Sequence, residues 1–171
     1  MTSRRHFLAL AACWLPVSAM SQKVPFPRPQ GPVLLEVAGA IQRQNSGRTA
    51  QLDLAMLDAL PQTSFSTNTI WTVGALSFSG PTLMSVLTSL GATEGKITAI
   101  AANDYSITLA PGTVDNSYPI LATRKNGVPF TLRQSGPIWL VYPYDSYEKY
   151  RTDLIYSQSV WQLIRLNVGA A

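Results

Sequence analysis

Cysteine and histidine, the side chains that most often act as nucleophile, general base or soft metal ligand, occur once each. They are Cys13 and His6, and both lie in an N-terminal segment with the features of an export leader. We expect this leader to be removed, which leaves no thiolate nucleophile, no Ser-His triad and no zinc site of Cys or His. The remaining chemistry belongs to carboxylates, hydroxyls, Arg and Lys, aromatic rings and the backbone.

The acidic residues and glycines form no recognisable catalytic or nucleotide-binding motif. The nine acidic residues show no paired pattern, and Gly74 and Gly80 stand alone rather than in a Walker loop or dinucleotide fingerprint. Without Arg4 and Arg5 of the leader, 11 of the 13 basic residues remain against nine acidic ones, with no Lys/Arg run. This balance is not typical of a nucleic-acid-binding protein, so no nucleic-acid partner is expected.

Residues 1–19 have the three regions of a signal peptide. Arg4 and Arg5 precede an apolar run, 7–15, that is too short to span a bilayer, and Ala19 ends a small-residue cleavage site. The Arg pair and the Phe-Leu that follows also resemble the twin-arginine export motif. We therefore expect a periplasmic protein cleaved near Ala19. The alternatives are an ordinary secretory leader and lipidation of the leader cysteine.

The elements that position the polar residues are mostly short strands. Residues 20–32 hold four prolines and are expected to form a linker, with folded sequence from Val33. The expected strands lie within 33–37, 63–72, 97–102, 105–109, 120–125, 128–132, 138–142 and 159–168. Two short helices are expected, one over 54–60 between the N-cap Asp53 and Pro61, and one that begins at Ser79 or Gly80 and ends at Gly91. Turns are expected at Asn103-Asp104 and Asn126-Gly127.

Five segments, in this order and at this spacing, resemble the molybdopterin-binding domain of the sulfite-oxidase fold. They are Ile70-Trp71-Thr72-Val73-Gly74, Phe78-Ser79-Gly80-Pro81 before a Leu-rich helix, Asn103-Asp104-Tyr105, Gly136-Pro137-Ile138-Trp139-Leu140-Val141-Tyr142-Pro143, and Ser159-Val160-Trp161-Gln162-Leu163. The resemblance implies a strand-rich α+β domain over 33–168, with mixed β-sheets and a few short helices.

The chain departs from this family at the metal. In the family's enzymes a cysteine shortly before the Trp-like position binds molybdenum, whereas Thr67 stands at about that place here. A neutral hydroxyl is a poor substitute for a thiolate ligand. The chain is therefore similar to a small exported branch that lacks the metal ligand, in which some members are periplasmic pterin-responsive regulators. The resemblance implies a pterin without molybdenum as the ligand, with molybdopterin as the less favoured cofactor.

A pterin requires an aromatic or apolar face to stack on and donors and acceptors along its ring edge. Such groups occur in the loop at the lost metal ligand, in the Asn-Asp turn and in the Tyr-rich stretch before the last strand. The expected ligand-binding residues are Thr67, Asn68, Trp71, Asp104, Tyr105, Tyr144, Arg151, Tyr156, Ser157 and Ser159. Arg151 is expected to clamp the ring or to pair with Asp153, and Trp161 is expected in the core. No catalytic residue and no metal ligand is expected.

The preferred hypothesis is a non-catalytic pterin-binding module that regulates a membrane-bound signalling partner. By resemblance, that partner is a cyclic-di-GMP enzyme or a histidine kinase with a periplasmic domain. One alternative is a molybdopterin-dependent oxidoreductase with atypical metal ligation. Another is a structural periplasmic domain whose cleft is empty.

Overall fold

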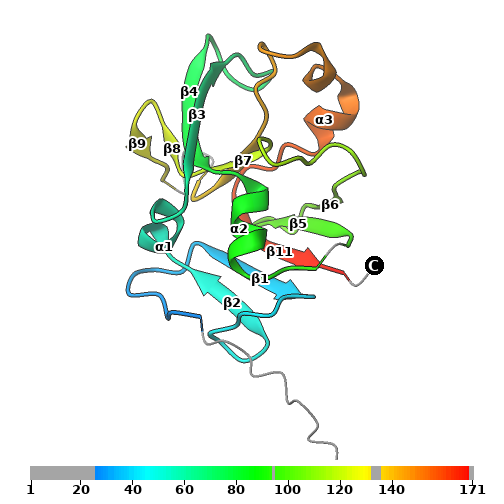
Figure 1. Ribbon diagram of the computed structural model, residues 1–171. Helices are drawn as coiled ribbons and strands as arrows, with labels where there is room; N and C mark the ends of the chain where they lie inside the picture. Colours follow the sequence, from blue (N-terminus) through cyan, green and yellow to red (C-terminus); the bar gives the residue numbers. More distant parts are fainter. Residues whose placement is uncertain (1–25, 94, 132–135, 170–171) are drawn as a thin grey trace, which may run out of the picture.

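The computed structural model describes residues 26–93, 95–131 and 136–169. A five-stranded sheet forms one half of the fold, and the long β3–β4 hairpin rises from the other half (Figure 1). Helix α2 lies between these two parts, and α3 lies beside the loop end of the hairpin. The leader residues, including Cys13 and His6, fall outside the described residues.

The five-stranded sheet has the order β2-β1-β11-β5-β6. Its strands are β1 (Leu35–Gly39), β2 (Thr49–Leu52), β5 (Ile97–Ala101), β6 (Ser106–Thr108) and β11 (Leu163–Val168). The central pair, β1 and β11, is parallel and places Val37 opposite Leu166, while the other pairs are antiparallel. Val37 and Leu166 are both fully buried, so the register is fixed by the apolar face that they share.

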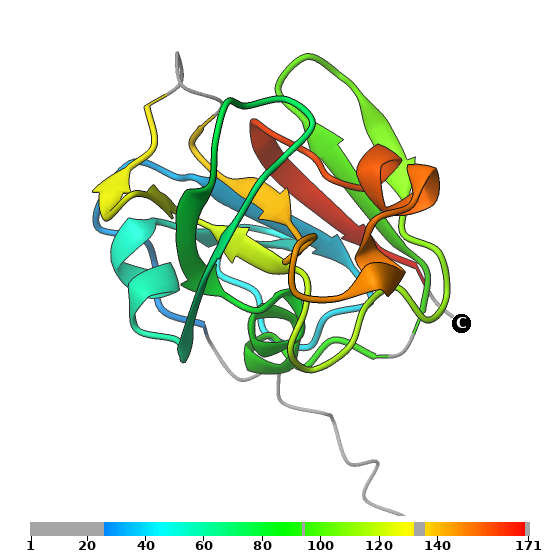
Figure 2. The same cartoon turned by 90° about the horizontal axis from the view of Figure 1, so that it is seen from above.

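The second half combines a four-stranded sheet, β3-β4-β8-β9, with a two-stranded sheet, β10-β7. Its strands are β3 (Gln62–Thr67), β4 (Leu76–Pro81), β7 (Ile120–Ala122), β8 (Arg124–Lys125), β9 (Val128–Pro129) and β10 (Trp139–Val141). The turn between β8 and β9 is made by Asn126 and Gly127, with φ of 51° and 77°. Positive φ at both positions is the conformation that the Asn-Gly pair predicts for a two-residue hairpin. Figure 2 shows this half from above, with the β3–β4 hairpin in front of the larger sheet.

Each α-helix begins at a side chain that accepts a backbone N–H. The helices are α1 (Leu54–Asp58), α2 (Leu83–Ser89) and α3 (Asp153–Ser157), and a 3-10 turn, η2 (Glu148–Tyr150), precedes α3. Asp53, Thr82 and Thr152 are their N-caps. None of the helices in the described ranges is long and apolar enough to cross a membrane.

Two expected elements begin at other residues, and one helix was not expected. The second helix does not begin at Ser79 or Gly80, because these residues and Pro81 belong to β4, and Thr82 caps α2 instead. The last strand does not begin at Ser159, because Gln162 adopts a φ of 52° and interrupts the extended backbone before Leu163. A third helix, α3, forms where no helix was expected.

The core follows the apolar pattern of the sequence. The expected stripe of α2, consisting of Leu83, Val86, Leu87 and Leu90, is buried. Gly91 follows with a φ of 60°, as expected for a residue just beyond a helix C-terminus. The strand-rich α+β architecture, with mixed sheets and short helices, is therefore confirmed.

Candidate functional site

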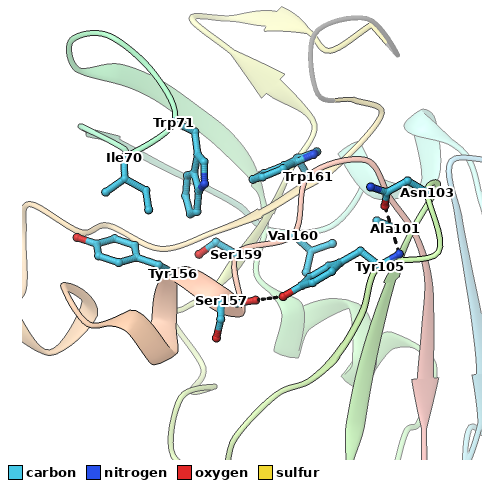
Figure 3. A pocket seen from close by; sticks show the side chains of 10 residues that line it. All are labelled: Ile70, Trp71, Ala101, Asn103, Tyr105, Tyr156, Ser157, Ser159, Val160 and Trp161. Carbon is cyan, nitrogen blue, oxygen red and sulfur yellow. Dashed lines mark hydrogen bonds between the residues drawn. The ribbon is translucent and has the colours of Figure 1, made fainter.

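The candidate site is a pocket of about 340 Å³ at the meeting point of three segments. The segments are the β3–β4 loop, the β5–β6 turn, and the end of α3 with the turn that leads to β11 (Figure 3). The lining residues are Ile70, Trp71, Ala101, Asn103, Tyr105, Tyr156, Ser157, Ser159, Val160 and Trp161. The volume falls near the lower end of the range for small-molecule sites, about 300–1,000 Å³.

Aromatic rings form most of the pocket wall. The ring centroid of Trp71 lies 5.5 Å from that of Trp161 and 6.0 Å from that of Tyr156, both in edge-to-face arrangements. Trp161 is 37% exposed, so the expectation that it belongs to the core is wrong. The left-handed backbone of Gln162 prevents β11 from starting before Leu163. Trp161 therefore lies in the preceding turn, on the pocket wall. Such rings offer flat faces on which an aromatic ligand can stack.

Hydrogen bonds link two of the three segments and connect the end of α3 to Tyr144. The Tyr105 hydroxyl donates to the backbone carbonyl of Ser157 at 2.8 Å, which links the β5–β6 turn to α3. The Tyr144 hydroxyl donates to Oγ of Ser159 at 2.6 Å, and this Oγ donates to the carbonyl of Ile155 at 2.8 Å. Burial raises the pKa of Tyr144 far above its ordinary value, so the phenol keeps its proton at physiological pH.

Thr67, the residue expected at the place of the family's metal ligand, is fully buried and lies outside the pocket lining. Its Oγ1 accepts the N–H of Asp145 at 3.1 Å and donates to the carbonyl of Asn68 at 3.2 Å. A hydroxyl enclosed and bonded in this way does not fit the role of a molybdenum ligand. Within the described ranges, no group of three or more His, Cys, Asp or Glu side chains could hold a metal ion.

The pocket lining carries no charged side chain in the part of the chain that the structure describes. Arg151, expected to clamp the ligand, is exposed and absent from the lining. Its charge acts elsewhere and contributes to lowering the pKa of Asp145, after the larger effect of the Asn68 backbone N–H that donates to that carboxylate. An anionic ligand buried in this pocket would therefore find no cationic side chain in the lining to compensate its charge.

The structure brings together five of the ten expected ligand-binding residues. Those that line the pocket are Trp71, Tyr105, Tyr156, Ser157 and Ser159. Those that do not are Thr67, Asn68, Asp104, Tyr144 and Arg151. Tyr144 supports the pocket wall through its hydrogen bond to Ser159, while Thr67 and Asn68 both bind Asp145. Asp104, with a φ of 64°, forms the tip of the β5–β6 turn.

The residues that sequence reasoning missed are mostly apolar. Ile70, Ala101 and Val160 give no sign in sequence that distinguishes them from core residues. Asn103 precedes the expected Asp104, and the turn motif therefore pointed to the right loop but the wrong side chain. Oδ1 of Asn103 accepts the N–H of Tyr105 at 3.2 Å, so Asn103 rather than Asp104 stabilises the turn with its side chain.

Comparison with known proteins shows the fold alone. No protein-family model and no curated protein sequence matches the chain. Among solved structures, the sulfane dehydrogenase SoxCD from Paracoccus pantotrophus is similar, with a TM-score of 0.57 and 16% identity. The match covers 80% of this chain but only 38% of the SoxCD chain. Because that neighbour is a sulfite-oxidase-family protein, the fold is of the sulfite-oxidase type that the sequence motifs implied.

Proposed function

We propose that this protein is an exported, non-catalytic module that binds an uncharged pterin in the aromatic pocket. The observation that carries the proposal is the pocket itself, which has two Trp and two Tyr rings in its lining, about 340 Å³ of space and no charged side chain. A bicyclic pterin is flat, polar at its edge and small enough for this volume. The enclosed hydroxyl of Thr67 supports a ligand without molybdenum.

The proposed role is regulation of a membrane-bound signalling partner with a periplasmic domain, either a cyclic-di-GMP enzyme or a histidine kinase. The β3–β4 loop supports this role because it connects the pocket to the surface. Ile70 and Trp71 line the pocket, whereas Val73, two residues further along, is 99% exposed. A ligand that fixes the position of Trp71 would also fix the surface that Val73 presents to a partner.

The first experiment is analysis of protein purified from its native host. Pterin fluorescence, together with mass spectrometry of the released molecule, is expected to show a pterin at close to one per chain. Metal analysis is expected to show no stoichiometric molybdenum. Molybdenum at one per chain would favour the oxidoreductase alternative, and a sample with neither pterin nor metal would favour an empty structural domain.

The second experiment tests the proposed export. Replacement of both Arg4 and Arg5 by Lys keeps the charge of the leader but removes the twin-arginine pair. The variant is expected to accumulate in the cytoplasm, whereas the unaltered protein reaches the periplasm. Normal export of the variant would show that the leader uses the general secretory route.

A further inference from the structure

The Asn103 side chain has a defined orientation at the open edge of the pocket. Its Oδ1 accepts the backbone N–H of Tyr105 at 3.2 Å, a bond that only the oxygen of the amide can make. The Nδ2 group is therefore turned away from Tyr105. It has no hydrogen-bond partner among the described residues.

A second unpaired donor lies opposite this amide. Figure 3 shows the indole nitrogen of Trp161 and the side-chain nitrogen of Asn103 pointing toward one another. Nε1 of Trp161 has no hydrogen-bond partner among the described residues either. An indole nitrogen can only donate, and Nδ2 of an amide can only donate. Two donors that converge on one place favour a single acceptor atom between them.

Two acceptors on the pocket wall are already engaged. The carbonyl of Ser157 accepts from Tyr105, and Oγ of Ser159 accepts from Tyr144. The two unpaired groups next to the turn, Nδ2 of Asn103 and Nε1 of Trp161, are both donors. Without Lys or Arg in the lining, a phosphate or carboxylate would be poorly compensated, whereas a neutral carbonyl oxygen is a matched acceptor.

We infer that Asn103 and Trp161 form a two-donor site for a ring carbonyl of the ligand. This inference rests on the proposed pterin-binding function and narrows it to a class, neutral bicyclic heterocycles with a carbonyl at the edge. Rings that carry an amino group in place of this carbonyl should bind more weakly, because the two donors of the protein would then face a third donor. The ring itself stacks within the aromatic walls that Trp71 and Trp161 provide.

The test compares two ligands with two forms of the protein. Pterin carries a carbonyl at position 4, and 2,4-diaminopteridine carries an amino group there. The unaltered protein is expected to bind pterin about 10-fold more tightly than the diamino compound in calorimetric titration. Asn103→Asp keeps an oxygen for the Tyr105 N–H but replaces the donor by an acceptor, so the preference is expected to reverse.

Trp161→Phe is the second variant, and it keeps an aromatic wall while it removes one donor. Its preference for pterin over the diamino compound is expected to fall about fivefold. Thermal melting of both variants reports whether they are folded. If Asn103→Asp does not fold, the ligand preference of Trp161→Phe still tests the two-donor site. Arg151→Ala, outside the lining, is the control and is expected to keep the preference of the unaltered protein.

The outcomes separate this inference from the proposed function. If the unaltered protein binds both ligands equally, or if neither variant changes its preference, the two-donor site is wrong while pterin binding stands. If the unaltered protein binds neither ligand, the proposed function is wrong and the two-donor site falls with it. Reversal in Asn103→Asp with a reduced preference in Trp161→Phe supports both.

Discussion

Thr67 and Asp145, 78 residues apart, are joined by a hydrogen bond of 3.1 Å from the Asp145 N–H to the Thr67 hydroxyl. The Asp145 carboxylate in turn accepts two bonds from Asn68, from its backbone N–H at 2.6 Å and from its Nδ2 at 2.8 Å. The start of the β3–β4 loop is thereby tied to the segment that follows β10. Thr67, which the sequence resemblance placed at a metal-ligand position, therefore serves as a structural link between these two segments.

Thr67→Val tests this link. Valine has nearly the shape of threonine but leaves the Asp145 N–H without its acceptor, so we expect a loss of about 1–2 kcal/mol in the free energy of unfolding. Urea denaturation measures this loss. Thr67→Ser keeps the hydroxyl and is the matched control. An unchanged midpoint in Thr67→Val would mean that the bond contributes nothing.

Trp161 and Trp139 provide a matched pair of substitutions within one aromatic cluster, with ring centroids 6.3 Å apart. Trp139 is 2% exposed, so Trp139→Ala is expected to destabilise the protein by about 3–5 kcal/mol. Trp161→Ala is expected to cost only about 1 kcal/mol of stability. It should nevertheless weaken pterin binding by about 10-fold, because the pocket loses one wall.

Thermal melts and calorimetric titration on these two variants decide whether Trp161 belongs to the binding site or to the core. A Trp161→Ala protein that binds pterin with unchanged affinity would remove Trp161 from the site. Equal destabilisation by the two substitutions would restore the expectation that Trp161 belongs to the core.

Asp53 links acid stability to a defined set of hydrogen bonds. Its carboxylate accepts the N–H groups of Gly31, Met56 and Gln30, with the Gly31 bond the largest cause of a pKa below the ordinary 3.8. A folded-state pKa below the unfolded one means that the stabilisation is complete above 3.8 and is lost as pH falls through the folded pKa.

Asp53→Asn is expected to cost about 1–3 kcal/mol at neutral pH, since an amide has one oxygen to offer to three donors. The difference from the unaltered protein should shrink as pH falls below 3.8. Denaturation curves between neutral pH and strongly acidic pH measure it. A difference that stays constant with pH would contradict the assignment.

Gly80 is a point of close approach between β4 and β7. A Cβ at this position would meet the backbone carbonyl of Leu121, which cannot move aside without breaking the sheet. Gly80→Ala is therefore expected to destabilise by about 3 kcal/mol. Gly74→Ala, with open space around its Cβ position but a φ of 73°, is the control and should cost only about 1 kcal/mol. Thermal melts that rank the two in the opposite order would contradict the close approach.

The parts of the fold that were predicted correctly have local causes. The Asn126-Gly127 turn depends on two residues that tolerate positive φ, and the buried stripe of α2 depends on spacing within one helix. The errors arise where a residue has two possible roles. Pro81 fits the first turn of a helix as well as the end of a strand, and the strand was chosen by pairing with Gln62, which the local sequence does not reveal.

In the site, too, the residues predicted correctly have local causes and the errors arise from tertiary structure. Trp71, Tyr105 and Tyr156 were expected because a pterin needs aromatic faces and these rings lie in the three loops considered. Trp161 was misplaced because glutamine has no evident preference for the φ of 52° that Gln162 adopts, and that one dihedral angle redirects the chain. Arg151 was expected in the site because a guanidinium suits a ring carbonyl and because it lies in the Tyr-rich stretch, but side-chain direction in a surface turn is set by tertiary packing.

The three-segment construction of the pocket would make the proposed ligand a participant in folding. Its walls come from the loop after β3, the turn after β5 and the chain around the end of α3, which meet only in the native state. A ligand at 100 times its dissociation constant would stabilise that state by about 2.7 kcal/mol. Amide hydrogen exchange in all three segments should then slow together. In a cell that lacks the ligand, a larger fraction of the chains would be open to proteases, so the abundance of the protein would follow the supply of the ligand.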